Sequence, residues 1–166
     1  MCPCRSAGTG HVKDAVFAER LTATTSGRYG NSVALTYDAV GRRRTEGLTI
    51  AGQTYTATST YDAAAQVTQQ KYPDGSTVDR TYTARGQLSQ VQYNSNPIAT
   101  RSYDALGRLI QSTAGNGVIT THTYQADDLH QGIEIRDAAR GLVDMFTFTY
   151  DANRNKTAEQ RGGVMS

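Results

Sequence analysis

The sequence has no tryptophan and contains only two cysteines, three prolines and three phenylalanines in 166 residues. Leu, Ile, Val and Phe together number 27, which falls below the roughly 20% under which chains often fail to build a packed core. No apolar run approaches the roughly 18 residues that a membrane-spanning segment needs. We therefore expect neither a thick hydrophobic core nor a membrane span.

The N-terminal segment, residues 1–28, carries little that predicts structure. Cys2 and Cys4 are separated by one residue, so a disulfide between them would close a strained loop, and we interpret them as part of a disordered terminus. Met1 is not followed by a secretory hydrophobic stretch, so any export signal is expected to lie outside this sequence. The role of this segment stays open.

The charges are balanced and dispersed. Seventeen basic and 15 acidic residues give a net charge of +2, and the only basic run is 42–44, so we expect no nucleic-acid partner. Disorder usually accompanies high net charge and few aromatic residues, whereas this chain has ten tyrosines. Order through repeated strand pairing fits the composition better.

A repeat organises most of the chain. Tyrosines followed by a short turn-forming segment recur at intervals of 24, 21, 21, 21 and 26 residues, which is the signature of a repeat array with variable loops. These tyrosines are Tyr37, Tyr61, Tyr82, Tyr103, Tyr124 and Tyr150. We predict about six repeats over residues 29–161, with 162–166 as the truncated start of a further unit.

The fullest repeat motif runs from Tyr103 to Leu109. Its Asp104 can accept bonds from backbone amides two residues on, and Gly107 tolerates a positive φ, which predicts a type I turn with a glycine bulge. The residues that define the repeat are Tyr37, Asp38, Gly41, Arg42, Tyr61, Asp62, Tyr82, Gly86, Tyr103, Asp104, Gly107, Arg108, Tyr124, Tyr150 and Asp151. We interpret all of them as structural.

Three repeats depart from the motif at the glycine position, which holds Ala65, Asp128 or Arg154. A positive φ at Ala65 should cost on the order of 1 kcal/mol, so we expect a different turn there. In the last repeat Asn153 or Asn155 is expected to take the left-handed conformation.

A second set of turns falls midway between the tyrosine motifs, so each repeat holds two strands. These turns are at Ala51–Gly52, Pro73–Gly75, Asn94–Pro97, Gly115–Gly117 and Asp137–Gly141. The segments between turns are rich in Thr, Tyr, Val and Ile, which favours antiparallel strands. The predicted fold is all-β: an array of antiparallel β-hairpin repeats forming a curved, single-layer spiral sheet.

The two faces of this sheet should differ. A hydroxyl residue precedes every motif tyrosine, so a row of hydroxyls should line the face opposite the tyrosines. The hydroxyl residues are Thr36, Thr60, Thr81, Ser102, Thr123 and Thr149. The tyrosines themselves are predicted to stack on one another in a ladder, each pair contributing roughly 0.2 to 1 kcal/mol.

The motif of Tyr, Asp, one or two residues, Gly, Arg and Leu resembles the YD repeat of the Rhs, wall-associated and teneurin-like proteins. It is complete at Tyr103–Leu109 and nearly so at Tyr37–Arg42. The resemblance implies one segment of a β-shell in a larger secreted or surface bacterial protein. In bacterial members, which include polymorphic toxins, such shells commonly enclose a C-terminal toxin. Nothing matches the family's self-cleaving core region.

No catalytic, cofactor or metal site is predicted, and we do not expect an enzyme. His11, His122 and His130 are too scattered to resemble a metal or catalytic motif. Asp127 and Asp128 lie near His130 but occupy a turn. Gly115–Gly117 lacks the lysine and helix of a phosphate-binding loop.

A second hypothesis from another class stays open. A polar surface rich in tyrosine suits stacking on sugar rings, and Arg80, Arg101 and Arg108 could bond glycan groups. The chain would then be a carbohydrate-binding or adhesion module at the cell surface. The expected partners are thus neighbouring repeats, with an enclosed toxin domain under the first hypothesis or glycans under the second.

Overall fold

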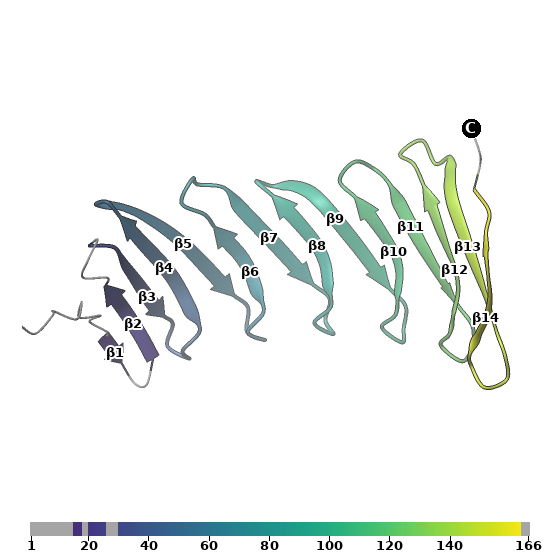
Figure 1. Ribbon diagram of the computed structural model, residues 1–166, viewed down its shortest axis with the longest axis horizontal. Helices are drawn as coiled ribbons and strands as arrows, with labels where there is room; N and C mark the ends of the chain where they lie inside the picture. Colours follow the sequence, from purple (N-terminus) through teal and green to yellow (C-terminus); the bar gives the residue numbers. More distant parts are fainter. Residues whose placement is uncertain (1–14, 18–19, 26–29, 164–166) are drawn as a thin grey trace, which may run out of the picture. The chain divides into compact units, whose positions relative to one another are not determined.

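The computed structural model describes residues 15–17, 20–25 and 30–163, which form fourteen strands (Figure 1). The strands are β1 (Ala15–Phe17), β2 (Arg20–Thr25), β3 (Ser32–Tyr37), β4 (Arg43–Ile50), β5 (Gln53–Tyr61), β6 (Val67–Lys71), β7 (Thr77–Tyr82), β8 (Leu88–Tyr93), β9 (Asn96–Tyr103), β10 (Leu109–Ala114), β11 (Ile119–Tyr124), β12 (His130–Arg136), β13 (Leu142–Tyr150) and β14 (Lys156–Arg161). Two of them, β1 and β2, lie within residues 1–28, where no strands were expected. Cys2 and Cys4, interpreted above as part of a disordered terminus, lie outside the described residues.

The chain divides into two compact units, Met1–Thr77 and Val78–Ser166. In the first unit, strands β1 to β6 each pair antiparallel with the next strand along the chain. In the second unit, strands β7 to β14 do the same. Each unit is therefore a meander of hairpins, as expected where turns are short and strands alternate in direction.

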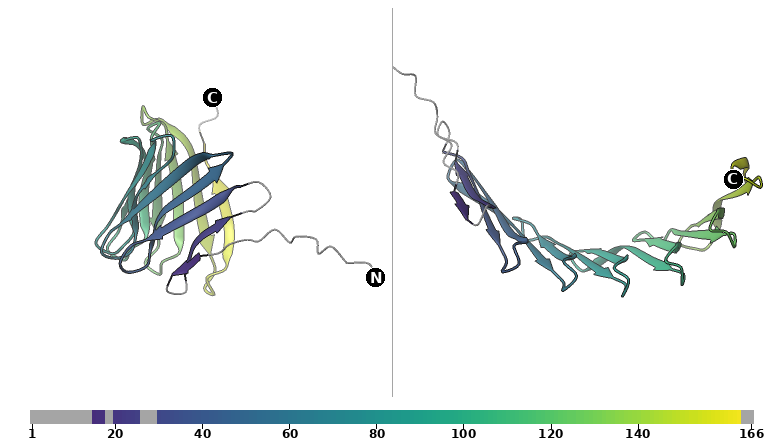
Figure 2. Two further views of the ribbon diagram at one scale, coloured as in Figure 1. Left: turned by 90° about the vertical axis from the view of Figure 1, so that its left-hand side faces the viewer. Right: turned by 90° about the horizontal axis from the view of Figure 1, so that it is seen from below.

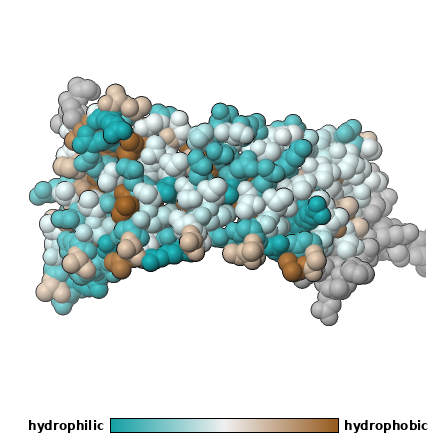
Figure 3. Space-filling view, turned by 180° about the vertical axis from the view of Figure 1, so that it is seen from behind, coloured by the Kyte–Doolittle hydropathy of each residue, from teal (hydrophilic) through white to brown (hydrophobic). Residues whose placement is uncertain are grey.

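Each unit is a single layer of strands, and the layer of the second unit is curved (Figure 2). Among the described residues no hydrophobic side chain is fully buried, and the one buried charged residue is Asp144. In Figure 3 the brown apolar side chains form small separate patches among polar ones. The predicted all-β, single-layer hairpin array without a thick core is confirmed.

Every motif tyrosine is the last residue of its strand, closing β3, β5, β7, β9, β11 or β13. At each of these positions the register with the following strand shifts by one residue. Such a bulge bends the strand and increases its local twist. The repeated bulge places each tyrosine opposite the residue six positions later, as in the pair Tyr103 and Leu109.

The second set of turns comprises two types. Ala51–Gly52 and Asn94–Ser95 are two-residue turns in which both residues have positive φ, the type I′ geometry that matches strand twist. The prediction of a four-residue turn at Asn94–Pro97 is wrong in its extent, because Asn96 and Pro97 already belong to β9. The turns at Pro73–Gly75 and Gly115–Gly117 instead have one glycine with positive φ each.

Candidate functional site

The six tyrosine motifs form turns with one hydrogen-bond pattern. In the first, the Asp38 amide donates to the Arg42 carbonyl and the Gly41 amide donates to the Asp38 carbonyl, both at 2.9 Å. The same two bonds close the turns that begin at Asp62, Thr83, Asp104, Gln125 and Asp151. This is the pattern of a type I turn followed by a bulge residue in the left-handed conformation.

The left-handed residue is glycine in three turns and a side-chain-bearing residue in the others. Ala65, Asp128 and Arg154 have φ of 63°, 71° and 67°, close to the glycine values. The prediction of a different turn at Ala65 is therefore wrong, as is the expectation that Asn153 or Asn155 takes this conformation. Strand pairing on both sides of the turn outweighs a local cost of about 1 kcal/mol.

The motif aspartate caps its own turn. One Asp104 carboxylate oxygen accepts the amides of Leu106 and Arg108, both at 2.9 Å, while the other accepts the Arg108 Nε at 2.7 Å. The backbone bond from Arg108, reinforced by its guanidinium, outweighs partial burial and holds the pKa of Asp104 below its ordinary value. At Asp38 burial is the largest influence, but the bonds from Arg42 together still lower its pKa.

The motif arginine reaches from one repeat into the next. Arg42 bonds Asp38 of its own turn and donates through Nη1 to the carbonyl of Asp62 at 2.8 Å. Its guanidinium lies 4.7 Å from the ring centre of Tyr61. In the fourth repeat, Arg108 likewise bonds Asp104 of its own turn and lies 4.6 Å from the ring centre of Tyr124 in the next repeat. Each such guanidinium is thus both a charge-assisted donor and a cation over a ring face.

The motif tyrosine makes a second contact between repeats, a hydrogen bond from its hydroxyl to the preceding repeat. The hydroxyl of Tyr61 donates to the Arg43 carbonyl of the preceding repeat at 2.7 Å. Tyr103 and Tyr124 donate in the same way to the carbonyls of Leu88 and Leu109, at 2.8 and 2.9 Å. The coupling between repeats therefore runs in both directions, arginine forward and tyrosine backward.

The predicted ladder of directly stacked tyrosines is wrong at Tyr61 and Tyr124, whose faces carry arginines. Motif tyrosines of successive repeats lie on alternate strands, about 9 to 10 Å apart, because neighbouring strands are spaced by about 4.8 Å. Aromatic rings pack at centroid separations of about 4.5 to 7 Å. At Tyr61 and Tyr124 the guanidiniums of Arg42 and Arg108, from the turns before the intervening strands, take up this space.

Repeats without the motif arginine make the same kind of contact with other residues. The Gln87 side chain donates to the Gly107 carbonyl at 2.6 Å, and Arg85 donates to the Ala105 carbonyl. In the opposite direction, Arg154 of the last repeat donates back to the carbonyl of Asp127 in the preceding repeat. The link between one turn and the next is thus maintained through backbone carbonyls, which any sequence provides.

The face opposite the tyrosines carries the predicted hydroxyls, several of which pair across strands. Their oxygens are 2.6 to 3.2 Å apart in the pairs Thr36–Thr45, Thr60–Thr68, Thr81–Ser89 and Thr149–Thr157. In the fifth repeat, Thr123 instead bonds the Gly132 carbonyl at 3.4 Å. Such pairs stabilise the sheet on its polar face.

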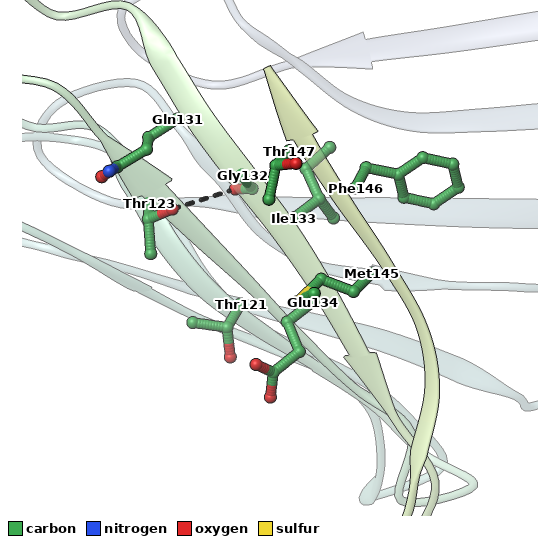
Figure 4. A pocket seen from close by; sticks show the side chains of 9 residues that line it. All are labelled: Thr121, Thr123, Gln131, Gly132, Ile133, Glu134, Met145, Phe146 and Thr147. Carbon is green, nitrogen blue, oxygen red and sulfur yellow. Dashed lines mark hydrogen bonds between the residues drawn. The ribbon is translucent and has the colours of Figure 1, made fainter. Parts of the chain in front are cut away.

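A hollow of about 330 Å³ lies on this hydroxyl face over β11, β12 and β13 (Figure 4). Gly132, Thr121, Thr123 and Glu134 are among the residues that line it. Figure 4 shows the Phe146 ring pointing away from the other side chains. The lining offers hydroxyls and one carboxylate but lacks a nucleophile paired with a base.

Asp127 and Asp128, predicted from the sequence to lie in a turn, both face arginines of neighbouring repeats. Asp128 accepts a bond from Arg108 at 2.6 Å, and Asp127 faces Arg154 at 3.9 Å. No cluster of three or more potential metal ligands occurs within residues 15–17, 20–25 and 30–163. That part of the chain also contains no helix that is long and apolar enough to span a membrane.

His122 and His130, which sequence reasoning treated as separate, lie together. Their Nδ1 and Nε2 atoms are 3.2 Å apart across the β11–β12 hairpin. The bulge at Tyr124 places His130 opposite that tyrosine and diagonal to His122. A sequence signal existed, because residues two before and six after a motif tyrosine meet in this way, as do Phe148 and Lys156 in the last repeat.

No protein-family model and no curated protein matches the chain. Similar solved structures are chains of toxin complexes. TcdB2-TccC3 has a TM-score of 0.72 at 17% identity over 93% of this chain, and TcdB2-TccC3-Cdc42 has 0.71 at 17% over 89%. The Photorhabdus luminescens Tc holotoxin pore has 0.66 at 18% over 89%. This chain spans only 8 or 9% of those chains, and the likeness is one of fold.

Proposed function

We propose that this chain is a YD/Rhs-type wall segment of a larger secreted or surface protein, forming part of a β-shell around a polypeptide cargo. The observation that carries the proposal is the coupling between successive turns through Arg42 and Arg108 in one direction and tyrosine hydroxyls in the other. A single layer without a core gains its stability from such contacts between neighbours.

The role proposed is structural rather than catalytic. The motif aspartates Asp38, Asp104 and Asp151 each accept amides of their own turn, so their carboxylates serve backbone geometry. The fold likeness to toxin-complex chains supports a shell with a toxin cargo. By that same likeness we propose that the parent protein is exported.

Limited proteolysis of the intact protein that contains this segment tests the proposal. A polypeptide shielded by the shell should survive protease in the wild type and be cut faster in Arg42→Gln. Arg43→Gln is the matched control, because Arg43 is the adjacent arginine and its guanidinium pairs with Glu46 of its own strand at 2.9 Å instead of with the next repeat. Absence of any protected polypeptide in the wild type, or glycan binding on an array, would instead favour an adhesion module.

A further inference from the structure

We propose that His122 and His130 form a binding site for a divalent transition-metal ion such as Zn²⁺, bridging strands β11 and β12. His122 lies two residues before the motif tyrosine of β11, and His130 is the first residue of β12. Both side chains lie on the tyrosine-bearing face, since His130 is opposite Tyr124 in the register. The site does not depend on the proposed shell function.

The distance between the two rings suits one ion. His122 Nδ1 and His130 Nε2 are 3.2 Å apart. Two nitrogens bound to a tetrahedral zinc at about 2.0 to 2.1 Å are separated by about 3.3 Å, the edge of the tetrahedron. The two ring planes are within 13° of parallel, with centres 5.2 Å apart. Rotation of each ring about its χ2 torsion, which has a broad energy minimum, directs both lone pairs at one ion.

Binding an ion requires only a change of tautomer in the histidine pair, because neutral imidazole is the form that ligates a metal. In the hydrogen-bonded pair one facing nitrogen carries a proton. When the ion binds, that proton moves through solvent to the outer nitrogen of the same ring, and no net proton is released.

Aromatic neighbours hold His130 in position. The Tyr124 ring packs against it at 4.6 Å and 16°, and Phe148 lies 6.3 Å away. Tyr124 is itself fixed by its hydroxyl bond to Leu109. Arg108 lies over the Tyr124 ring, and its charge is balanced by the two carboxylates that it bonds, Asp104 and Asp128. A preorganised ligand pair loses little freedom on binding.

The ion would complete its shell with water, because both histidines are only partly buried and no cluster of three ligands is present in the described part of the chain. Imidazole ligands suit zinc, copper and nickel. Because the ligands come from two strands, binding would link β11 to β12 and stabilise this hairpin, by an amount that grows with the logarithm of the ion concentration above the dissociation constant.

Titration with zinc chloride of the whole chain carrying Cys2→Ser and Cys4→Ser, followed by calorimetry and by histidine ring resonances, tests the site. The two serines remove thiols that would themselves bind zinc, and this chain is the wild-type reference for the histidines. One ion per chain should bind, shift the ring signals of His122 and His130, and raise the melting temperature. Saturable binding and the melting shift should be lost in His122→Gln and in His130→Gln. His11→Gln, which changes the third histidine of the sequence, is the matched control and should bind as the wild type does.

Three outcomes would overturn the proposal: no saturable binding by the wild type, binding retained in both hairpin variants, or binding lost in His11→Gln. Circular dichroism of each variant shows whether the sheet is intact. Should a variant fail to fold, the ring resonances of the wild type decide, since zinc must shift those of His122 and His130 together.

Discussion

At the scale of single residues, the left-handed position of the tyrosine turns shows how much local strain the array tolerates. Ala65 occupies it with a φ of 63° and still closes its turn, through a bond of 3.2 Å from its amide to the Asp62 carbonyl. At the same position in the turn after β9, Gly107 has a φ of 88° and no side chain that would be strained. The alanine turn is therefore a site where stability can be gained.

We expect Ala65→Gly to raise the free energy of unfolding by up to about 1 kcal/mol, because glycine adopts a positive φ without steric cost. Urea denaturation measures the change. Ala64→Gly is the control, since Ala64 is not among the residues with positive φ and glycine there only adds freedom to the unfolded chain. Equal effects of the two variants would refute the assigned turn.

The tyrosine hydroxyl has a measurable share in the coupling between repeats. Tyr103→Phe removes only the bond to the Leu88 carbonyl, 2.8 Å long and partly buried, so unfolding should become easier by about 0.5 to 1.5 kcal/mol. Tyr93→Phe is the control, because Tyr93 is 45% exposed and should change stability by less than about 0.5 kcal/mol. A thermal melt of both variants separates them.

The charge of the motif aspartate should appear in the pH dependence of stability. The pKa of Asp104 is lowered in the folded chain from its ordinary value of 3.8. As the pH falls, the Asp104 carboxylate is therefore protonated in the unfolded chain before it is protonated in the folded chain. The stability that this carboxylate contributes is lost as the pH falls from about 3.8 through the lower pKa of the folded chain. Asp104→Asn should lose less stability than the wild type between neutral pH and pH 3, in denaturation series at each pH.

At the scale of strands, hairpins pack so closely that a glycine can be required for space alone. A Cβ built at Gly132 in β12 would lie 2.9 Å from the Phe146 carbonyl oxygen and 3.2 Å from the Thr123 hydroxyl. At Gly47 in β4 the nearest atom would be 3.6 Å away. Both glycines are buried within strands, so they form a matched pair.

Gly132→Ala should destabilise the chain by about 1 to 3 kcal/mol, because a backbone carbonyl cannot give way as a flexible side chain can. Gly47→Ala should be neutral or stabilise by up to about 1 kcal/mol, since alanine loses less freedom on folding. Equilibrium unfolding of both variants tests this contrast. Equal losses of stability in the two variants would mean that the close approach of β13 to Gly132 is not the reason why this position requires glycine.

Strands and turns could be predicted from sequence because each depends on residues close together in the chain. The motif from Tyr103 to Leu109 contains every group that closes its own turn. The contacts between repeats could not be predicted in this way. Arg42 bonds the carbonyl of Asp62, which lies 20 residues later in the chain, and a backbone carbonyl has no sequence signature. The pairing of His122 with His130 depends on a bulge, which shifts the register that simple alternation would assign.

At the scale of the whole molecule, repeats within each unit contact their neighbours, and no hydrophobic side chain of the described residues is buried in a common core. Stability in such an array is approximately a sum of repeat and interface terms. Within the second unit, Arg108 links the turn after β9 to the turn after β11 through Asp104, Asp128 and the Tyr124 ring. Removing that one interface should therefore have a local effect.

We expect Arg108→Gln to speed amide hydrogen exchange in β9 to β12 while leaving β13 and β14 close to the wild type. Local opening follows the interface that is lost, because no buried core transmits the change. The control is Arg101→Gln. Arg101 lies on β9, so this variant also removes one positive charge, but away from the turn, and it should leave exchange in β11 and β12 unchanged. Hydrogen-exchange mass spectrometry resolves these segments. A uniform rise across β7 to β14 would show that the unit opens as one cooperative body, and the nearest-neighbour account of its stability would then fail.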